Sequence, residues 1–199
     1  MINNKRDALF TGTMAVRDQH TIDFAALENY MKSCVEGFCG PIEVEQFRGG
    51  QSNPTYRVIA PNGRYVVRRK PPGKLLPSAH AVDREYRVLA ALQATDVPTP
   101  RVYTLCEDAK IIGTPFYVME YVEGRVYWEL WLPDRDPAFR GAVFDSMNDA
   151  IAKLHSVPYT AVGLGDFGKP RDYVARQIAR WSKQYRASET ETIEEMDRL

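Results

Sequence analysis

The chain has 199 residues, of which 44% are hydrophobic and 26% are charged, a composition typical of a globular protein with a hydrophobic core. Its 26 basic residues balance its 26 acidic residues, which excludes an overall attraction to nucleic acid or to an anionic membrane. No apolar run is long enough to span a membrane, and the first residues lack the apolar core of a signal peptide.

The first half of the chain predicts one helix followed by three strands. Residues 1–20 are polar and are expected to form a flexible arm. From Asp23 the apolar residues recur at helical spacing, with Asp23 as the cap and Gly37 as the end. Alternating and β-branched residues then predict an antiparallel meander. Its strands are expected at 42–47, 55–59 and 64–69.

The second half begins with one more helix and two more strands. Apolar spacing predicts a helix over 82–92, and strand patterns follow at 101–106 and 116–121. Five strands with one helix inserted after the third is the element order of a kinase small lobe. Beyond Gly124 the pattern is helical, and two long apolar faces are expected to be buried. These faces are Phe139, Val143, Met147, Ile151 and Leu154, and then Val174, Ile178, Trp181 and Tyr185.

A glycine-rich segment between two predicted strands is the first candidate for binding. It consists of Gly49, Gly50, Gln51, Ser52 and Asn53. Glycines let the backbone approach a phosphate closely, and successive N–H groups form an anion-binding nest. Ser52 and Asn53 add side-chain donors. A hairpin loop that only needs positive φ angles remains the alternative.

A cation and a carboxylate are the second candidate. Val66 and Arg68 share one face of a predicted strand, so Val66 could cover an adenine while Arg68 reaches a phosphate. Glu85 lies on the following helix and could pair with Arg68, as in the ion pair that orients phosphates in kinases. The alternative is that both are solvated surface charges.

A connector after the last predicted strand is the third candidate. The backbone groups of Glu120, Tyr121 and Val122 could hydrogen-bond the edge of an adenine, although an edge strand running into a loop would look the same. His20 and His80 are expected on the solvent side. Cys34, Cys39 and Cys106 fit neither a disulfide framework nor a zinc motif, which favours free thiols in a cytoplasmic protein.

Together these residues resemble the aminoglycoside phosphotransferase/choline kinase family. The likeness is strongest to a branch found alone in bacteria or fused to acyl-CoA dehydrogenases in animals. The matching stretches are 49–56, 67–77, 82–86, 98–100, 116–120 and 152–155. The run from Arg68 to Pro77 is specific to that branch.

The resemblance implies an α+β, protein-kinase-like fold with a five-stranded antiparallel small lobe and one helix. The small lobe would span 21–122, and 123–199 would begin a helical large lobe. The resemblance also implies ATP with Mg²⁺ and phosphoryl transfer to the hydroxyl of a small molecule, such as a hydroxy acid or a hydroxyacyl-CoA. Gly49 to Asn53 would cover the phosphates, Arg68 would pair with Glu85, and Glu120 to Val122 would hold adenine.

Two departures from the family pattern matter. Arg68 stands where most kinases carry lysine, and its neighbours Arg69 and Lys70 leave the register open. No residue matches the catalytic aspartate, the asparagine or the metal-binding aspartate, which are expected beyond Leu199, so the chain alone is expected to be inactive. The alternative is a non-catalytic nucleotide-binding or scaffold module. We expect no nucleic acid or membrane partner, and no oligomeric state is predicted.

Overall fold

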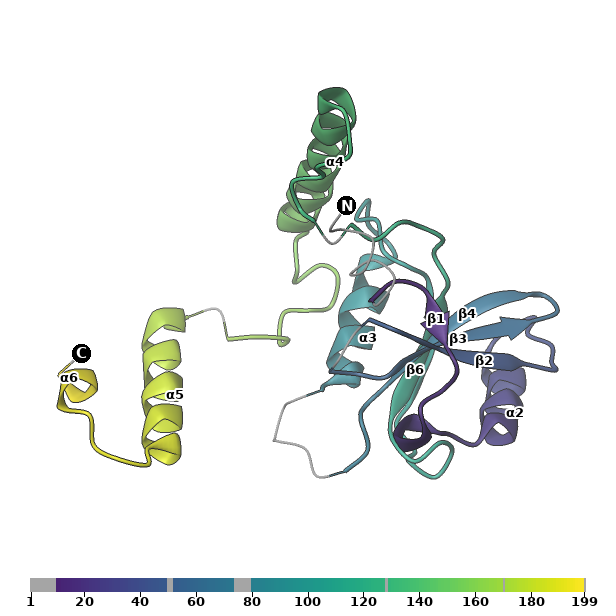
Figure 1. The fold of residues 1–199 in the computed structure, drawn as a ribbon, viewed down its shortest axis with the longest axis horizontal. Helices are drawn as coiled ribbons and strands as arrows, with labels where there is room; N and C mark the ends of the chain where they lie inside the picture. The colour runs from purple at the N-terminus through teal and green to yellow at the C-terminus, as the bar shows by residue number, and fades with distance from the viewer. Residues whose placement is uncertain (1–9, 50–51, 74–79, 128, 170, 199) are drawn as a thin grey trace. The chain divides into compact units, whose positions relative to one another are not determined.

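The computed structural model describes residues 10–49, 52–73, 80–127, 129–169 and 171–198. The chain forms two compact units, Met1–Pro158 and Tyr159–Leu199 (Figure 1). None of the helices in these described ranges combines the length and the apolar character that a membrane span requires. The expected division into lobes at residues 122 and 123 stays a prediction.

The first unit is built around a six-stranded antiparallel sheet with the strand order β1-β2-β3-β4-β6-β5. The strands are β1 (Thr13–Met14), β2 (Glu43–Phe47), β3 (Thr55–Ala60), β4 (Gly63–Arg69), β5 (Val102–Cys106) and β6 (Phe116–Glu120). Five of them lie where the sequence predicts strands, within two residues at either end. β4 is therefore a central strand, flanked by β3 and β6.

The prediction of five strands is corrected to six, because β1 comes from the segment expected to be an arm. Thr13 lies opposite Phe47 in the β1–β2 pairing, and its hydroxyl donates to Glu45 Oε2 over 2.5 Å. A strand of two residues is too short to show an alternating pattern. The described part of residues 1–20 also contains a short 3₁₀ helix, η1 (Asp18–His20).

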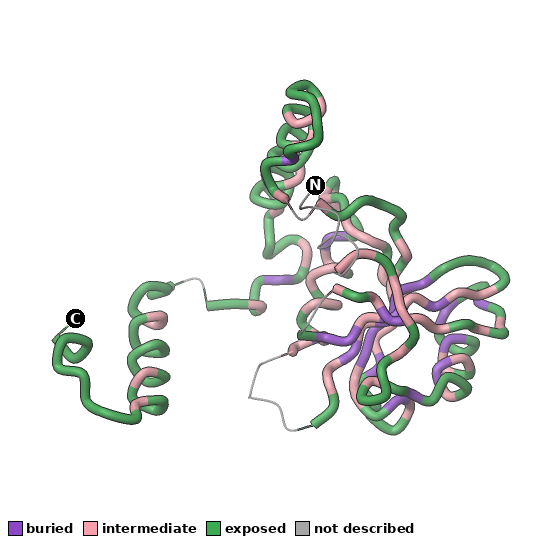
Figure 2. The backbone as a smooth tube through the Cα atoms, viewed as in Figure 1, coloured by how far each residue is buried: buried purple, intermediate pink, exposed green. Residues whose placement is uncertain are grey.

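Helix α2 (Phe24–Cys34) covers one face of the sheet and forms the main core with it. Asp23 Oδ1 accepts from Ala26 N over 2.9 Å, which confirms the predicted cap. Leu27 and Met31 are fully buried, and buried residues are concentrated along the sheet and the inner side of this helix (Figure 2). The strand side of this core comprises Tyr56, Val58, Tyr65, Val67, Cys106, Phe116 and Val118.

Helix α3 (Val82–Leu92) contributes Val82 and Leu92 as buried residues. Because side chains alternate along a strand, Tyr65 and Val67 of β4 face the α2 core, while Val66 and Arg68 point to the opposite side. Glu85 of α3 contacts Arg68, so α3 lies on that opposite side. The two helices therefore place apolar packing on one face of β4 and a polar cluster on the other.

Three helices complete the described chain: α4 (Pro137–Ser156), α5 (Tyr173–Ser188) and α6 (Glu194–Asp197). Asp136 caps α4 through a 2.9 Å bond from Phe139 N, with Pro137 at the first helical position. The expected burial of their apolar faces is wrong: Ile151 is 47% exposed and Ile178 is 62% exposed. Helical spacing shows which residues share a face, but burial also requires an element that covers it.

Candidate functional site

Three side chains form a row across the centre of the sheet. Thr55 of β3 lies opposite Arg68 of β4, and Arg68 lies opposite Tyr117 of β6. Residues directly opposite each other in antiparallel strands point to the same face, so all three side chains point toward α3. Val66 shares this face and is buried, with 6% of its surface exposed. A ligand could therefore reach Val66 only after whatever covers it has shifted.

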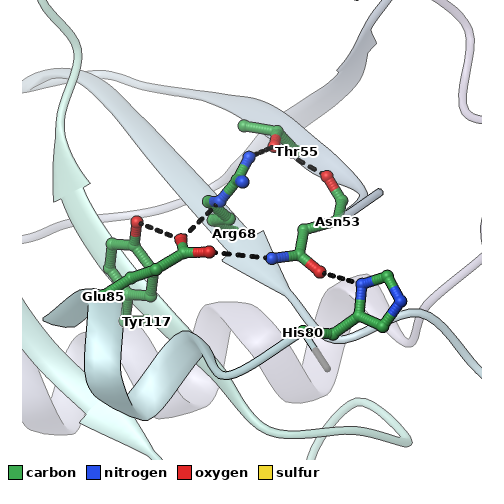
Figure 3. A network of polar contacts seen from close by, with 6 residues as sticks. All are labelled: Asn53, Thr55, Arg68, His80, Glu85 and Tyr117. Carbon is green, nitrogen blue, oxygen red and sulfur yellow. Dashed lines mark hydrogen bonds and ion pairs between the residues drawn. The ribbon is translucent and has the colours of Figure 1, made fainter. Parts of the chain in front are cut away.

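Glu85 reaches this row from the first turns of α3 and accepts three hydrogen bonds (Figure 3). Its Oε2 accepts from Arg68 Nε over 2.6 Å and from the Tyr117 hydroxyl over 3.2 Å. Its Oε1 accepts from Asn53 Nδ2 over 3.0 Å. Both carboxylate oxygens are thus held, and the predicted pairing of Arg68 with Glu85 is present.

The guanidinium of Arg68 is held from two sides. Besides the Nε bond to Glu85, its Nη1 donates to Thr55 Oγ1 over 3.0 Å, and Thr55 in turn donates to the carbonyl of Asn53. Nη2 makes no hydrogen bond to any residue that the structure describes. The Arg68 side chain is 28% exposed, so Nη2 offers an oriented, charged donor to a ligand.

The register that the sequence left open among three neighbouring cations is now resolved. Arg69 points to the other face, where it is buried and donates from Nη1 to the carbonyl of Ile112 over 3.0 Å. Lys70 forms an ion pair with Asp83, with 3.4 Å between Nζ and Oδ1. Of the three cations, Arg68 is the one that pairs with Glu85.

The glycine-rich segment contributes its last residue to the cluster. Asn53 is buried, Ser52 is exposed and Gly49 is partly buried, whereas Gly50 and Gln51 lie outside the described residues. Asn53 Oδ1 lies 2.8 Å from His80 Nδ1. His80 was expected on the solvent side; it is partly buried, and its ring contacts this buried amide.

The connector after β6 lies beside the start of the glycine-rich segment. The ring of Tyr121 stacks on that of Phe47, the last residue of β2, with centroids 6.4 Å apart. Glu120 is tied to Arg101 by its backbone N–H and by its side chain. Val122 is exposed, and its backbone makes no hydrogen bond to another described residue. Such unpaired groups can bind the polar edge of a ligand.

The hydrogen-bonded cluster and the connector are separate features. Within the described residues no hydrogen bond joins Glu120, Tyr121 or Val122 to the cluster around Arg68. Burial, and secondarily the charge of Glu85, raise the pKa of Tyr117 above its ordinary value, so its hydroxyl stays protonated and donates to Glu85. The described part of the chain holds no cluster of three or more His, Cys, Asp or Glu side chains that could bind a metal.

Three residues of the cluster were not predicted as site residues. Thr55 and Tyr117 fall in the matching stretches 49–56 and 116–120, but only a correct strand register would have placed them beside Arg68. His80 follows a segment outside the described residues, and its own φ is +58°. No pattern in the sequence indicates that conformation at a histidine.

Comparisons with known proteins give a consistent result. The sequence profile of the phosphotransferase enzyme family matches residues 43–199. The chain is 47% identical over 188 residues to mouse acyl-CoA dehydrogenase family member 10, covering 94% of this chain and 18% of that protein. It is 39% identical to human acyl-CoA dehydrogenase family member 11, covering 92% of this chain and 24% of that protein. The chain thus spans at most about a quarter of these two curated relatives.

A solved structure is similar over most of the chain. It is the crystal structure of a Ralstonia eutropha protein with a provisional assignment as an aminoglycoside phosphotransferase, and it is 52% identical in sequence. The TM-score is 0.74, and the match covers 89% of this chain and 51% of that chain. At this identity the shared fold reflects shared ancestry.

Proposed function

Because this chain belongs to the phosphotransferase enzyme family, we propose that it is the nucleotide-binding part of an ATP-dependent phosphotransferase that works in the cytoplasm. One observation carries the proposal. Glu85 and Thr55 hold Arg68 from two sides, while Nη2 makes no bond within the described chain. This arrangement suits a guanidinium that binds a phosphate, since a fixed donor loses little entropy when the ligand binds.

The other candidate residues take roles around Arg68. The segment from Gly49 to Asn53 supplies backbone donors to the phosphates, as the glycines allow. The backbone of Glu120 to Val122 holds the adenine edge, and Val66 supplies apolar surface beneath the base once the residues that cover it have shifted. Phe47 and Tyr121, which stack on each other, keep the connector beside the start of the glycine-rich segment.

The acceptor in this proposal is the hydroxyl of a small molecule. Two relatives named as acyl-CoA dehydrogenase family members contain a segment similar to this chain. A kinase domain in the same polypeptide as an acyl-CoA dehydrogenase could act on a related metabolite. This supports a hydroxy acid or a hydroxyacyl-CoA as the acceptor.

Mg²⁺ would neutralise charge on the transferred phosphate. The described residues do not form a cluster of ligands for it. The 199 residues also contain no match to the catalytic aspartate of the family. We therefore propose that this chain alone binds nucleotide without turning it over, while a product with the complete catalytic loop is active. The alternative is a module that binds nucleotide and never catalyses.

Calorimetry with ATP and with adenosine tests the proposal. We expect ATP to bind more tightly than adenosine, because the triphosphate contacts Arg68. Equal affinity for the two ligands would contradict a phosphate site, and failure of both to bind would contradict a nucleotide site. Phosphorylation of an alcohol by a product that contains the catalytic loop would favour the enzyme over the non-catalytic module. Turnover by the 199-residue chain would contradict its proposed inactivity.

A further inference from the structure

Asn53 is a buried polar residue whose side chain is engaged at both ends. Only 3% of its surface is exposed. Its Nδ2 lies 3.0 Å from Glu85 Oε1 and its Oδ1 lies 2.8 Å from His80 Nδ1. A buried amide without partners is costly, so these two contacts determine how the side chain sits.

The two contacts fix each other's direction. A carboxylate accepts hydrogen bonds, so the amide atom facing Glu85 must be the donor Nδ2, and Oδ1 must then face His80. An amide oxygen only accepts, so His80 Nδ1 must carry a proton. His80 thereby prevents the Asn53 amide from turning its oxygen toward Glu85, where two acceptors would repel each other.

The same two contacts join the glycine-rich segment to the start of α3. The carbonyl of His80 accepts from the backbone N–H of Val82, the first residue of α3, over 2.9 Å. Glu85 lies one turn further along that helix. His80 has a φ of +58°, a conformation that costs energy for a residue other than glycine and that its surroundings must hold in place.

We propose that Asn53 is a positioning residue of the phosphate site, which orients Glu85 against Arg68 and is itself oriented by His80. Asn53 acts through Glu85: its donated bond holds Oε1, which leaves Oε2 for Arg68. His80 acts one step further away. The role of Asn53 in binding rests on the proposed nucleotide-binding function. The orientation of Glu85 by Asn53, however, is expected in the chain without ligand as well.

The substitution Asn53→Asp keeps one contact of the Asn53 side chain and removes the other. Aspartate keeps an acceptor for His80 Nδ1 but places an oxygen, and a negative charge, against Glu85. We expect the preference for ATP over adenosine to fall about tenfold or more, as for the loss of a bond to a charged group. Adenosine affinity should not change, because Arg68 contacts only the phosphates. Asn62→Asp is the control, since Asn62 Nδ2 also donates a hydrogen bond, in this case to the carbonyl of Gly37 in a turn outside the site.

His80 supplies a second pair of variants. His80→Asn retains a side-chain N–H and is a residue that tolerates a positive φ, so it should keep most of the ATP preference. His80→Ala loses the donor and should reduce the preference, though less than Asn53→Asp. If His80→Ala matches the wild type, the role of His80 is contradicted.

The Nε–H resonance of Arg68 in an ¹H–¹⁵N spectrum tests the positioning without any nucleotide. This resonance is assigned by its loss in Arg68→Lys. In the wild-type chain it should be shifted and protected from exchange by Glu85, and in Asn53→Asp it should move toward the position of a free arginine.

If the resonance and the ATP preference both stay unchanged while the melting temperature falls as in Asn62→Asp, Asn53 is merely structural and the proposal is overturned. If ATP does not bind the wild type, the proposed function fails, while the resonance still decides whether Asn53 positions Glu85.

Discussion

Arg68 and Tyr117, which lie opposite each other on β4 and β6, donate to the same oxygen of Glu85, over 2.6 Å and 3.2 Å. One donor is a permanent cation, and the other is a phenol that must stay protonated to donate. The carboxylate of Glu85 therefore links the charge of Arg68 to the protonation of Tyr117. This link makes the phenol a probe of the ion pair.

Replacing Glu85 with glutamine should lower the pKa of Tyr117. Burial is the larger cause of its raised pKa and remains, but the negative charge that also raises it is removed. Ultraviolet titration of tyrosinate, with Tyr117→Phe subtracted to isolate the residue, measures the change. Glu43→Gln, at the exposed first residue of β2, is the control. An unchanged pKa of Tyr117 would show that its hydroxyl does not sense Glu85.

Arg68→Lys should weaken ATP binding about tenfold and leave adenosine binding unchanged. Lysine keeps the positive charge but cannot donate to Glu85, Thr55 and a phosphate in the planar geometry of a guanidinium. Calorimetry with both ligands measures the effect. Arg198→Lys, at an exposed position just after α6, is the matched control. A lysine variant that binds ATP as tightly as the wild type would show that charge alone is sufficient at this position.

Arg69→Met should reduce the free energy of unfolding by about 2 kcal/mol, because the buried Arg69 loses its bonds, the Ile112 carbonyl loses its donor and the His20 carbonyl keeps only the Tyr56 hydroxyl. Arg69 donates to the carbonyls of Ile112 and His20 over 3.0 Å and 3.3 Å, and it is 3% exposed. Urea denaturation measures the loss, with Arg198→Met as the exposed control. The preference for ATP over adenosine should stay unchanged. A shift in that preference would place Arg69 in the binding site and contradict its assignment to the opposite face of β4.

Acidification should destabilise the chain through His20. Burial lowers the pKa of His20 from its ordinary value of 6.5, and the charges of Arg69 and Arg17 act in the same direction. The unfolded chain then binds a proton more readily than the folded chain, so stability falls as the pH drops through 6.5.

Denaturation of His20→Gln between about pH 7.5 and about pH 5.5 should show a smaller loss of stability than the wild type. His155→Gln, at an exposed position near the end of α4, should behave as the wild type does. Equal pH dependence in all three chains would contradict a depressed pKa at His20.

The sequence predicted the parts of the fold that depend on local patterns. Alternation of side chains placed β2 to β6, and Asp23 marked the start of α2 as its cap. β1 was not predicted, because a strand of two residues is too short to show an alternating pattern. The burial of Ile151 and Ile178 was wrong because a helical period does not reveal whether another element covers the face.

The candidate site was predictable where residues repeat a known spacing. Arg68 and Glu85 fall on a strand and the next helix in the order of the family, and the structure joins them. The contact between Asn53 and His80 was not predicted, because it spans 27 positions and depends on a positive φ at a histidine. Tyr117 required the register between β4 and β6, which sequence alone does not determine.

The row of Thr55, Arg68 and Tyr117 lies on β3, β4 and β6. This position also determines how often local opening of the sheet exposes the row to solvent. In the order β1-β2-β3-β4-β6-β5, two strands lie outside β3 and one lies outside β6. Edge strands fray at a lower free energy than central ones, so β1 and β5 can open without disturbing this row. The backbone amides of Val67 and Val118 should then exchange with solvent only in the largest openings of the first unit. The fixed direction of the Arg68 guanidinium would thus persist through most fluctuations of the sheet.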